Sequence, residues 1–420
     1  MRLDSHGGRR DGGCLNPGPT ILVITTIPET MESFFIPQLR SLHQAGFDVR
    51  VASSPGPALD RLPLEEGTAR YGVPIERSPH PWRDLVSLWR LFRLMLRVHP
   101  QIVHAHTPKA GLLGMAAALL ARVPVRLYTV HGLPLLTRTG LRRRMLEIVE
   151  RASGRLATQS YAVSESVRAL LAELNLNQRA IILGSGSCGG VDIERFRPQP
   201  ELRAAVRNRY GIPRDAIIVT FVGRLSVDKG IVVLAEAWPR LADQMPELHL
   251  LLAGEPDATD PVPEPALRAL RSHPRVHSIG IIPQEQVPSV YAATDIAVLP
   301  TYREGLSQMA LEAGACEVPL VSTRVSGLDA VVHGVTGLLV RPGSASGLQD
   351  SILRLARDPG LRRALSVAAR AHIVEHFSES RVNGLWIAEY LRRAGDSRPG
   401  GATPTLPAAA GIQKGSHSAT

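Results

Sequence analysis

The stretch IIVTFVGRLSVDKGIVVLAEAW (217–238) decides the fold class of this 420-residue chain. It opens with an apolar, largely β-branched run over 217–223, which is the composition of a buried strand. A turn bounded by Gly223 and Gly230 follows, and the next residues have the period of a helix. A strand that leads into a helix through a short glycine turn is the repeating unit of a parallel α/β sheet.

Similar units recur along the whole chain. In the first half we expect strands at 21–26, 48–53, 102–106, 125–130 and 161–164, and helices near 34–45, 85–97, 109–121, 141–153 and 165–174. In the second half we expect strands at 217–223, 248–254, 276–282, 295–300, 319–323 and 337–342, and helices near 230–245, 264–271, 285–293, 305–316 and 346–357. The alternation predicts an α/β protein with two doubly wound parallel sheets.

The two blocks meet at Arg197-Pro198-Gln199-Pro200, a sequence typical of an interdomain linker. The predicted organisation has five parts: a disordered tail over 1–19, an N-terminal domain over 20–197, a C-terminal domain over 198–375, a helix over 376–394 that packs back on the N-terminal domain, and a disordered tail over 395–420.

Composition favours a globular protein and excludes several classes. The chain is 44% hydrophobic and 20% charged, and its length suits two domains. Its longest apolar run, 111–121, is about half of what a membrane-spanning helix needs. The polar N-terminus lacks the apolar region of a signal peptide, and the three cysteines form neither a disulfide framework nor a CxxC pair. We therefore expect a cytoplasmic protein.

The net charge of +10 is unevenly distributed, with +8 on residues 20–197 and 0 on residues 198–394. Aromatic residues make up only 4% and no nucleic-acid-binding motif is present, so no nucleic acid partner is expected. Residues 82–97 interleave tryptophan with arginine, and residues 122–155 hold eight Arg against two Glu. We expect peripheral contact with an anionic membrane at its inner face, although 85–97 also has the period of an ordinary core-facing helix.

Arg224 and Lys229 lie in the turn that follows the strand at 217–223. Ligands of open α/β sheets bind beyond the carboxyl ends of the strands. Two cations beside the free N–H groups of a helix start suit a diphosphate. Only three of the 48 basic residues are lysine, which favours a need for a compact charge at position 229. Two solvated cations at a helix start are the alternative.

A second motif, Glu304-Gly305-Leu306-Ser307, follows the strand at 295–300 and enters the expected helix over 305–316. Glu312 comes eight residues after Glu304, which is about 12 Å along a helix axis. That length is comparable with the distance from the ribose to the sugar of a nucleotide-diphosphate sugar. The alternative is one Glu favoured by the helix dipole and one solvated Glu.

The first half offers four further candidates at strand ends, namely His104, His106, Lys109 and His131. We do not expect a metal there, because no Asp or Glu accompanies them at ligand spacing. The whole chain also lacks a DxD pair that would hold Mg²⁺. A satisfied core histidine is the alternative for His104.

Together these motifs resemble the GT-B glycosyltransferases of family 4. The second half carries GRLSVDKG (223–230), EGLSQMALEAGA (304–315) and SGLDAVVHGVTGLLV (326–340). The first half carries VHAHTPKAGLLGMAAAL (103–119), YTVHGL (128–133) and GSGSCGGVDIERF (184–196), which resemble the capsule and lipid-linked-oligosaccharide branch. That branch often transfers N-acetylated or deoxyamino sugars. The first loop departs from the pattern, since TTIPET (25–30) stands where many members have Gly-Gly.

The resemblance implies two Rossmann-like domains that face a cleft, and a retaining sugar transfer that needs neither metal nor cofactor. It implies a nucleotide-diphosphate sugar donor, UDP-linked, in polysaccharide or lipid-linked oligosaccharide biosynthesis. The basic charge of residues 20–197 adds the expectation of an anionic polyprenyl-diphosphate-linked acceptor. The catalytic residues that it implies are His131, Arg224, Lys229 and Glu304. The substrate-binding residues are Gly223, Gly280, Ile282, Gly305, Leu306, Ser307, Glu312, His106 and Lys109. Among these, Glu312 would bind the ribose, and Gly280 to Ile282 the base.

Two other classes stay open. A nucleotide-sugar epimerase, like the UDP-N-acetylglucosamine 2-epimerases, can use the same fold, because a fold alone does not determine function. A non-catalytic sugar-binding protein is the second alternative. The presence of Arg224, Lys229, Glu304 and Glu312 at family-4 spacing argues against both.

Overall fold

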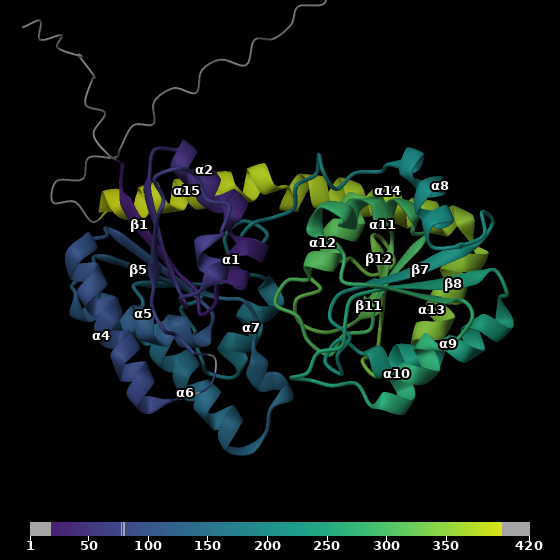
Figure 1. The fold of residues 1–420 in the computed structure, drawn as a ribbon, viewed down its shortest axis with the longest axis horizontal. Helices are drawn as coiled ribbons and strands as arrows, with labels where there is room; N and C mark the ends of the chain where they lie inside the picture. The colour runs from purple at the N-terminus through teal and green to yellow at the C-terminus, as the bar shows by residue number, and fades with distance from the viewer. Residues whose placement is uncertain (1–17, 77, 79, 397–420) are drawn as a thin grey trace, which may run out of the picture.

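The computed structural model describes residues 18–76, 78 and 80–396 and contains two six-stranded parallel sheets covered by helices (Figure 1). The first sheet consists of β1 (Thr20–Ile24), β2 (Asp48–Ser53), β3 (Ala69–Gly72), β4 (Ile102–His106), β5 (Val125–Val130) and β6 (Gln159–Ala162). The second consists of β7 (Ile217–Val222), β8 (Leu248–Ala253), β9 (Val276–Gly280), β10 (Ile296–Leu299), β11 (Leu320–Thr323) and β12 (Gly337–Val340). The predicted α/β class with doubly wound parallel sheets is confirmed.

Helices connect the strands and cover both sheets. Those of the first half are α1 (Pro28–Phe34), α2 (Ile36–Gln44), α3 (Pro57–Asp60), α4 (Pro81–Val98), α5 (Pro108–Leu120), α6 (Gly140–Leu156) and α7 (Glu165–Glu173). Those of the second half and the C-terminus are α8 (Pro200–Arg209), α9 (Ile231–Gln244), α10 (Glu264–Arg271), α11 (Val287–Ala293), α12 (Gln308–Ala315), α13 (Ala345–Arg357), α14 (Pro359–Phe377) and α15 (Glu379–Asp396). Two short 3₁₀ helices are η1 (Pro134–Thr137) and η2 (Gln284–Gln286).

Both sheets have the strand order of Rossmann-type folds. The first runs β3-β2-β1-β4-β5-β6, and the second runs β9-β8-β7-β10-β11-β12 in the same sense. The order reverses between β1 and β4 in one sheet and between β7 and β10 in the other. Ligands of such sheets bind at this switch point, beyond the carboxyl ends of the strands.

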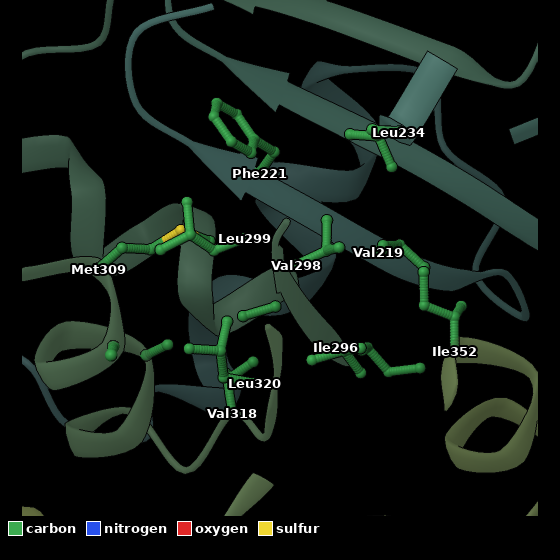
Figure 2. Close-up of a cluster of buried hydrophobic side chains, with 14 of the residues drawn as sticks. Val219, Phe221, Leu234, Ile296, Val298, Leu299, Met309, Val318, Leu320 and Ile352 are labelled. Atoms are coloured by element: carbon green, nitrogen blue, oxygen red, sulfur yellow. The ribbon is translucent and has the colours of Figure 1, made fainter. Parts of the chain in front are cut away.

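The second sheet is buried on both faces, as parallel sheets are. Figure 2 shows Val219 and Phe221 of β7 close to Val298 of β10, among side chains from the surrounding helices. All three residues are fully buried, and they belong to one hydrophobic cluster with Leu234 of α9 and Ile352 of α13. None of the helices in the described ranges is long and apolar enough to cross a bilayer.

The structure differs from the sequence prediction in several elements. The helix expected over 34–45 is α2, and the separate helix α1, which ends at Phe34 just before it, was missed. Strand β3 was missed because its sequence, ARYG, is short and half polar at the sheet edge. Helices α3 and α8, and all of α14 except its last two residues, were also missed. The single C-terminal helix expected over 376–394 is the end of α14 followed by α15, with a break at Ser378.

Helix α15 returns to the first half of the molecule and packs against α2 (Figure 1). Its Trp386 and Tyr390 are buried in the same cluster as Phe35 and Leu39. The chain leaves the first half near Val191 and re-enters it near Ser378. These two residues form a parallel β-bridge. We propose the division at 197/198 as the domain boundary. Most residues of the two expected disordered tails lie outside the described residues.

Candidate active site

Two adjoining cavities lie between the two halves at the switch points of the sheets. Their volumes are about 290 Å³ and about 220 Å³. Both are lined by Thr107 and His131 of the first half and by Glu304 and Gly305 of the second. A cleft that combines the carboxyl ends of two Rossmann-type sheets is a site for a ligand that both halves must hold.

The halves touch beside these cavities. A Cβ atom added to Gly305 would lie 1.8 Å from the carbonyl oxygen of His131, so only glycine fits there. Ser164, the N-cap of α7, donates its hydroxyl proton to the Gly305 carbonyl at 2.8 Å. The Asp329 carboxylate of the second half accepts from the Ser166 amide and hydroxyl at 2.8 and 2.5 Å. These contacts hold the 304–307 loop against the first half.

Lys229 and Glu304 form an ion pair with 2.6 Å between Nζ and Oε1. Their side chains are 24% and 10% exposed, so the pair is partly shielded from water. Arg224 lines the same smaller cavity, and its exposed guanidinium pairs with Asp257. The structure therefore brings Arg224, Lys229 and Glu304 together, as the sequence motifs predict.

Glycine shapes the loop that carries the two cations. Gly230 has a φ of +75°, and a Cβ atom there would lie 1.9 Å from the carbonyl oxygen of Pro300. Gly223 has a φ of +147° and ends β7 with a hydrogen bond from its N–H to the Ala253 carbonyl. Both positions favour glycine because other residues are strained at such angles.

The segment Glu304 to Ser307 is a loop and not the start of a helix. Helix α12 begins at Gln308, and Ser307 is its N-cap, accepting from the amide of Ala310. The prediction of a helix from residue 305 was wrong by three residues, because the serine competes for the backbone N–H groups. The spacing of about 12 Å between Glu304 and Glu312, which assumed a continuous helix, no longer holds.

Glu312 is buried in α12, 7% exposed, and lines neither cavity. Tyr291 donates its hydroxyl proton to Glu312 Oε2 at 3.4 Å. Burial raises the pKa of Glu312 to about 7. Gln308, which lies one turn before Glu312 on α12, does line the larger cavity.

The residues expected to bind a base lie at the end of β9. Gly280 has a φ of +66°, and its carbonyl accepts from the Gly254 amide at 2.8 Å. Ile282 is half-buried and packs against the core of the second half. Neither lines the two cavities, whereas the nearby Gln284 lines the larger one.

The histidines of the first half differ in their surroundings. His104 is fully buried between the hydroxyls of Tyr390 and Thr129, at 2.6 and 2.7 Å, so it is a satisfied core residue. His131 lines both cavities, and its Nε2 lies 2.9 Å from Nδ1 of His106. Burial lowers the pKa of His131 to about 4, so a neutral imidazole faces the cleft.

The two predicted substrate-binding residues of the first half also lie outside the cavities. His106 is fully buried behind His131, because the last residue of β4 points into the protein. The ammonium of Lys109 binds Asp84 Oδ1 and the Ser78 carbonyl, both at 2.6 Å, on the α4 side of the first half. A direct contact with substrate is therefore not supported for either residue in this arrangement.

The sequence analysis missed other residues of the cleft. Cys188 lines the larger cavity, 3.8 Å from Nε2 of His131, although cysteines were considered only for disulfides and CxxC pairs. Arg303 pairs with Asp228 at 2.5 Å and donates to Thr137 of the first half at 3.0 Å. No local sequence pattern predicts the Arg303–Thr137 hydrogen bond, because its two residues lie in different halves of the chain.

The chain is similar to known glycosyltransferases along most of its length. Residues 32–186 match the model described as Glycosyltransferase Family 4, and residues 216–358 match the model described as Glycosyl transferases group 1. The capsular polysaccharide biosynthesis glycosyltransferase CapM of Staphylococcus aureus is 31% identical over 81% of this chain and 89% of its own length. An Escherichia coli UDP-Gal:alpha-D-GlcNAc-diphosphoundecaprenol alpha-1,3-galactosyltransferase is 25% identical over 79% and 86%.

Solved structures agree with this fold. Sucrose-phosphate synthase from Thermosynechococcus elongatus has a TM-score of 0.75, with 22% identity over 90% of this chain and 100% of that one. Anabaena HepE in complex with UDP-glucose has a TM-score of 0.70, with 21% identity over 89% and 99%. The fold is therefore GT-B. The chain belongs to glycosyltransferase family 4 and is a nucleotide-sugar glycosyltransferase of that family.

Proposed function

We propose that this protein transfers a hexose, N-acetylated or deoxyamino, from a UDP-sugar to a polyprenyl-diphosphate-linked acceptor, with retention of configuration. The observation that carries the proposal is the Lys229–Glu304 ion pair, which lines the smaller cavity together with Arg224 and His131. Cations that already occupy this place can neutralise a departing diphosphate, while the carboxylate and neutral imidazole face the sugar.

The proposed roles of Arg224, Lys229, Glu304 and His131 follow from their positions around the smaller cavity, whereas those of Glu312 and of Gly280 to Ile282 rest on the resemblance to family 4. Arg224, Lys229 and the Gly223 turn hold the diphosphate, because fixed positive charge stabilises the leaving group in the transition state. Glu304 binds the hydroxyls of the transferred sugar, and the backbone N–H groups of Gly305 and Leu306 bind the sugar and phosphate. The N–H of Ser307 donates to the Gly327 carbonyl at 2.9 Å, so Ser307 acts by capping α12. His131 lies beside the reacting centre as a hydrogen-bonding group. Glu312 binds the ribose, and Gly280 to Ile282 accept the base.

The relatives support the substrate classes. HepE was solved with UDP-glucose, and the E. coli relative is named for UDP-Gal and a diphosphoundecaprenol-linked acceptor. CapM is named for capsular polysaccharide biosynthesis. The same classes suit the present cleft, which offers two cations for a diphosphate and polar groups for a sugar.

A panel of nucleotide sugars tests this function. Each is incubated with the full chain, with and without a polyprenyl-diphosphate-sugar acceptor, and the products are followed by mass spectrometry. We expect release of UDP together with a glycosylated acceptor. A new nucleotide sugar without nucleotide release would indicate an epimerase, and binding without any product would indicate a non-catalytic sugar-binding protein.

Metal removal is expected to leave the transfer rate unchanged. The reason is that Arg224 and Lys229 supply the charge that a divalent ion supplies in other transferases, and the sequence has no DxD pair. The rate is measured in EDTA and again after adding Mg²⁺ or Mn²⁺. Complete loss in EDTA with recovery on adding either ion would contradict the proposed roles.

The affinity for UDP is expected to rise with pH between about 6 and 8. Burial raises the pKa of Glu312 to about 7, and only the ionised carboxylate accepts hydrogen bonds from both ribose hydroxyls. Since the ionised fraction falls about tenfold one unit below the pKa, the affinity attributable to Glu312 falls by up to about tenfold from pH 8 to 6. Calorimetric titration measures it. Glu312→Gln cannot titrate and gives the background from UDP itself; an identical pH profile in this variant would exclude the role.

We further propose that the protein works in the cytoplasm, attached to the inner face of the cell membrane through α4 and α6. Helix α4 buries Leu91 and Met95 in the core, yet Trp82 is 82% exposed and Trp89 is 55% exposed on its other face. Leu141 and Ile148 of α6 are 82% and 65% exposed. The helices both pack against α5, so their outer faces lie on the same side of the first half.

Basic side chains surround these apolar residues, including Arg83, Arg90 and Arg97 on α4 and the run 142–144 on α6. The guanidinium of Arg93 lies over the Trp89 ring, 5.9 Å from its centroid. Each basic residue near an anionic surface contributes about 1 kcal/mol. A surface with exposed tryptophans and arginines fits an anionic bilayer, with apolar side chains at the acyl boundary.

Co-sedimentation with liposomes tests this surface. We expect binding to vesicles that contain phosphatidylglycerol, weak binding to phosphatidylcholine vesicles, and loss of binding as salt rises from about 0.05 to 0.5 M. Trp82→Ser with Trp89→Ser reduces binding, whereas Val367→Ser, an exposed apolar residue of the second half, does not. Equal recovery with both kinds of vesicle would indicate a soluble acceptor.

A further inference from the structure

Three side chains that bind soft metals gather at the wall of the larger cavity. They are His106 at the end of β4, His131 after β5, and Cys188 in the loop that precedes the crossing to the second half. One ring nitrogen of each histidine and the sulfur of Cys188 all lie within 4.8 Å of one another. Among the described residues this is the one group of its kind that could hold a metal ion.

The distances are close to those of a coordinated ion. His106 Nδ1 lies 2.9 Å from His131 Nε2, and Cys188 Sγ lies 3.8 Å from the same nitrogen. Tetrahedral zinc with bonds of about 2.0–2.1 Å to nitrogen and 2.3 Å to sulfur separates two nitrogens by about 3.3 Å, and nitrogen from sulfur by about 3.6 Å. Side-chain adjustments of well under 1 Å would bring these two pairs to that geometry.

The environment also suits a soft cation. His131 and Cys188 line the cavity, which gives the ion a route in and leaves its fourth position open to water. Two imidazoles and one thiol prefer zinc or cobalt to magnesium or calcium, which prefer oxygen ligands.

We propose that His106, His131 and Cys188 form an inhibitory site for Zn²⁺ or a similar soft divalent cation. On binding, the Cys188 thiol releases its proton to solvent and the thiolate takes the metal. The proton between His106 Nδ1 and His131 Nε2 must leave that position. It moves to the other nitrogen of the same ring, which is Nε2 in His106 or Nδ1 in His131. No electron is transferred. Nε2 of His106 is buried without a hydrogen-bond partner, so a proton placed there would be unsatisfied. This cost weakens metal binding, and we therefore expect the ion to bind reversibly.

Inhibition follows from the position of His131, which lines both cavities next to Gly305. A bound ion would occupy the imidazole lone pair and place positive charge where the donor sugar is expected. This step rests on the proposed function, whereas the binding of the ion does not. A measurement of binding that needs no activity therefore separates the two.

Cobalt provides that measurement. The full chain with Cys14→Ser, which removes the cysteine outside the described residues, is titrated with Co²⁺ under reducing conditions. We expect the near-ultraviolet thiolate-to-cobalt band and the visible bands of tetrahedral cobalt, and their displacement by Zn²⁺. Cys188→Ser and Cys188→Ala lose the thiolate band. Cys316→Ser, a buried cysteine outside the cluster, retains it.

Inhibition is measured on the same variants, each relative to its own rate without zinc, at about 1–100 µM Zn²⁺. The concentration for half-inhibition is expected to rise about tenfold or more in either Cys188 variant and to stay unchanged in Cys316→Ser. No thiolate band, or a band that persists without Cys188, would overturn the site. A band with uninhibited transfer would overturn the inhibitory role alone, and an absence of transfer with a clear band would count against the proposed function only.

Discussion

Replacing Lys229 with alanine is expected to lower kcat/KM by about 10²–10³-fold while the fold is retained. Loss of one preorganised donor to a developing negative charge typically costs that much. The ammonium is 2.6 Å from Glu304 and both groups line the smaller cavity, so its removal also leaves the carboxylate without its partner. Steady-state kinetics with the donor identified in the panel, together with a thermal melt, measures the two effects separately.

Two further variants sharpen this test. Lys229→Arg keeps the charge but replaces a compact ammonium with a planar group, so we expect partial recovery. Arg268→Ala removes an exposed cation that pairs with Glu264 across one turn of α10, and its kcat/KM should equal that of the wild type. Wild-type turnover by Lys229→Ala would exclude this lysine from the diphosphate site.

Replacing Gly305 with alanine is expected to lower kcat by about 10²-fold or more. The added Cβ would lie 1.8 Å from the His131 carbonyl oxygen and 2.5 Å from its carbon. Both atoms belong to backbone, so the 304–307 loop and the first half must separate at the position where both hold the donor. Displacements of about 1 Å in a positioned substrate can cost this much.

The matched control is Gly384→Ala in α15, where an added Cβ meets nothing within 4 Å. This variant should have wild-type kcat and an equal or slightly higher melting temperature. Gly305→Ala should melt near the wild type, since the clash lies between halves and not inside either core. A wild-type kcat for Gly305→Ala would mean that the contact between the halves is not needed for the reaction.

Much of the architecture could be predicted because it is local. The run IIVTFV is apolar and largely β-branched, and DVRVAS alternates valine with polar residues. Their neighbours have helical period, so strands are predicted at 217–223 and 48–53. The edge strand β3 lacks such a run. The division between α1 and α2 depends on Pro37 and on how Phe35 packs in the core, which period alone does not reveal.

The site could be predicted only where its residues share a motif. Arg224, Lys229 and Glu304 follow neighbouring strands, and the carboxyl ends of parallel strands meet at one edge. The start of α12 was placed too early because Ser307 was not recognised as a cap. Cys188 and His131 are 57 positions apart, and their proximity arises from packing across the first half. No local pattern contains that information.

The return of α15 to the first half has a consequence for how the molecule can be rebuilt. Val191 and residues 377 and 379 exchange backbone hydrogen bonds of 2.9 and 2.8 Å, so both ends of the intervening segment lie side by side. Topologically, the half with the cation-bearing loop is an insertion into the other half, which is complete only when Trp386 and Tyr390 are present. A graft that exchanges the segment between these two points as one cassette would keep both cores intact. A simple fusion at residue 198 would instead pair one first half with a foreign terminal helix.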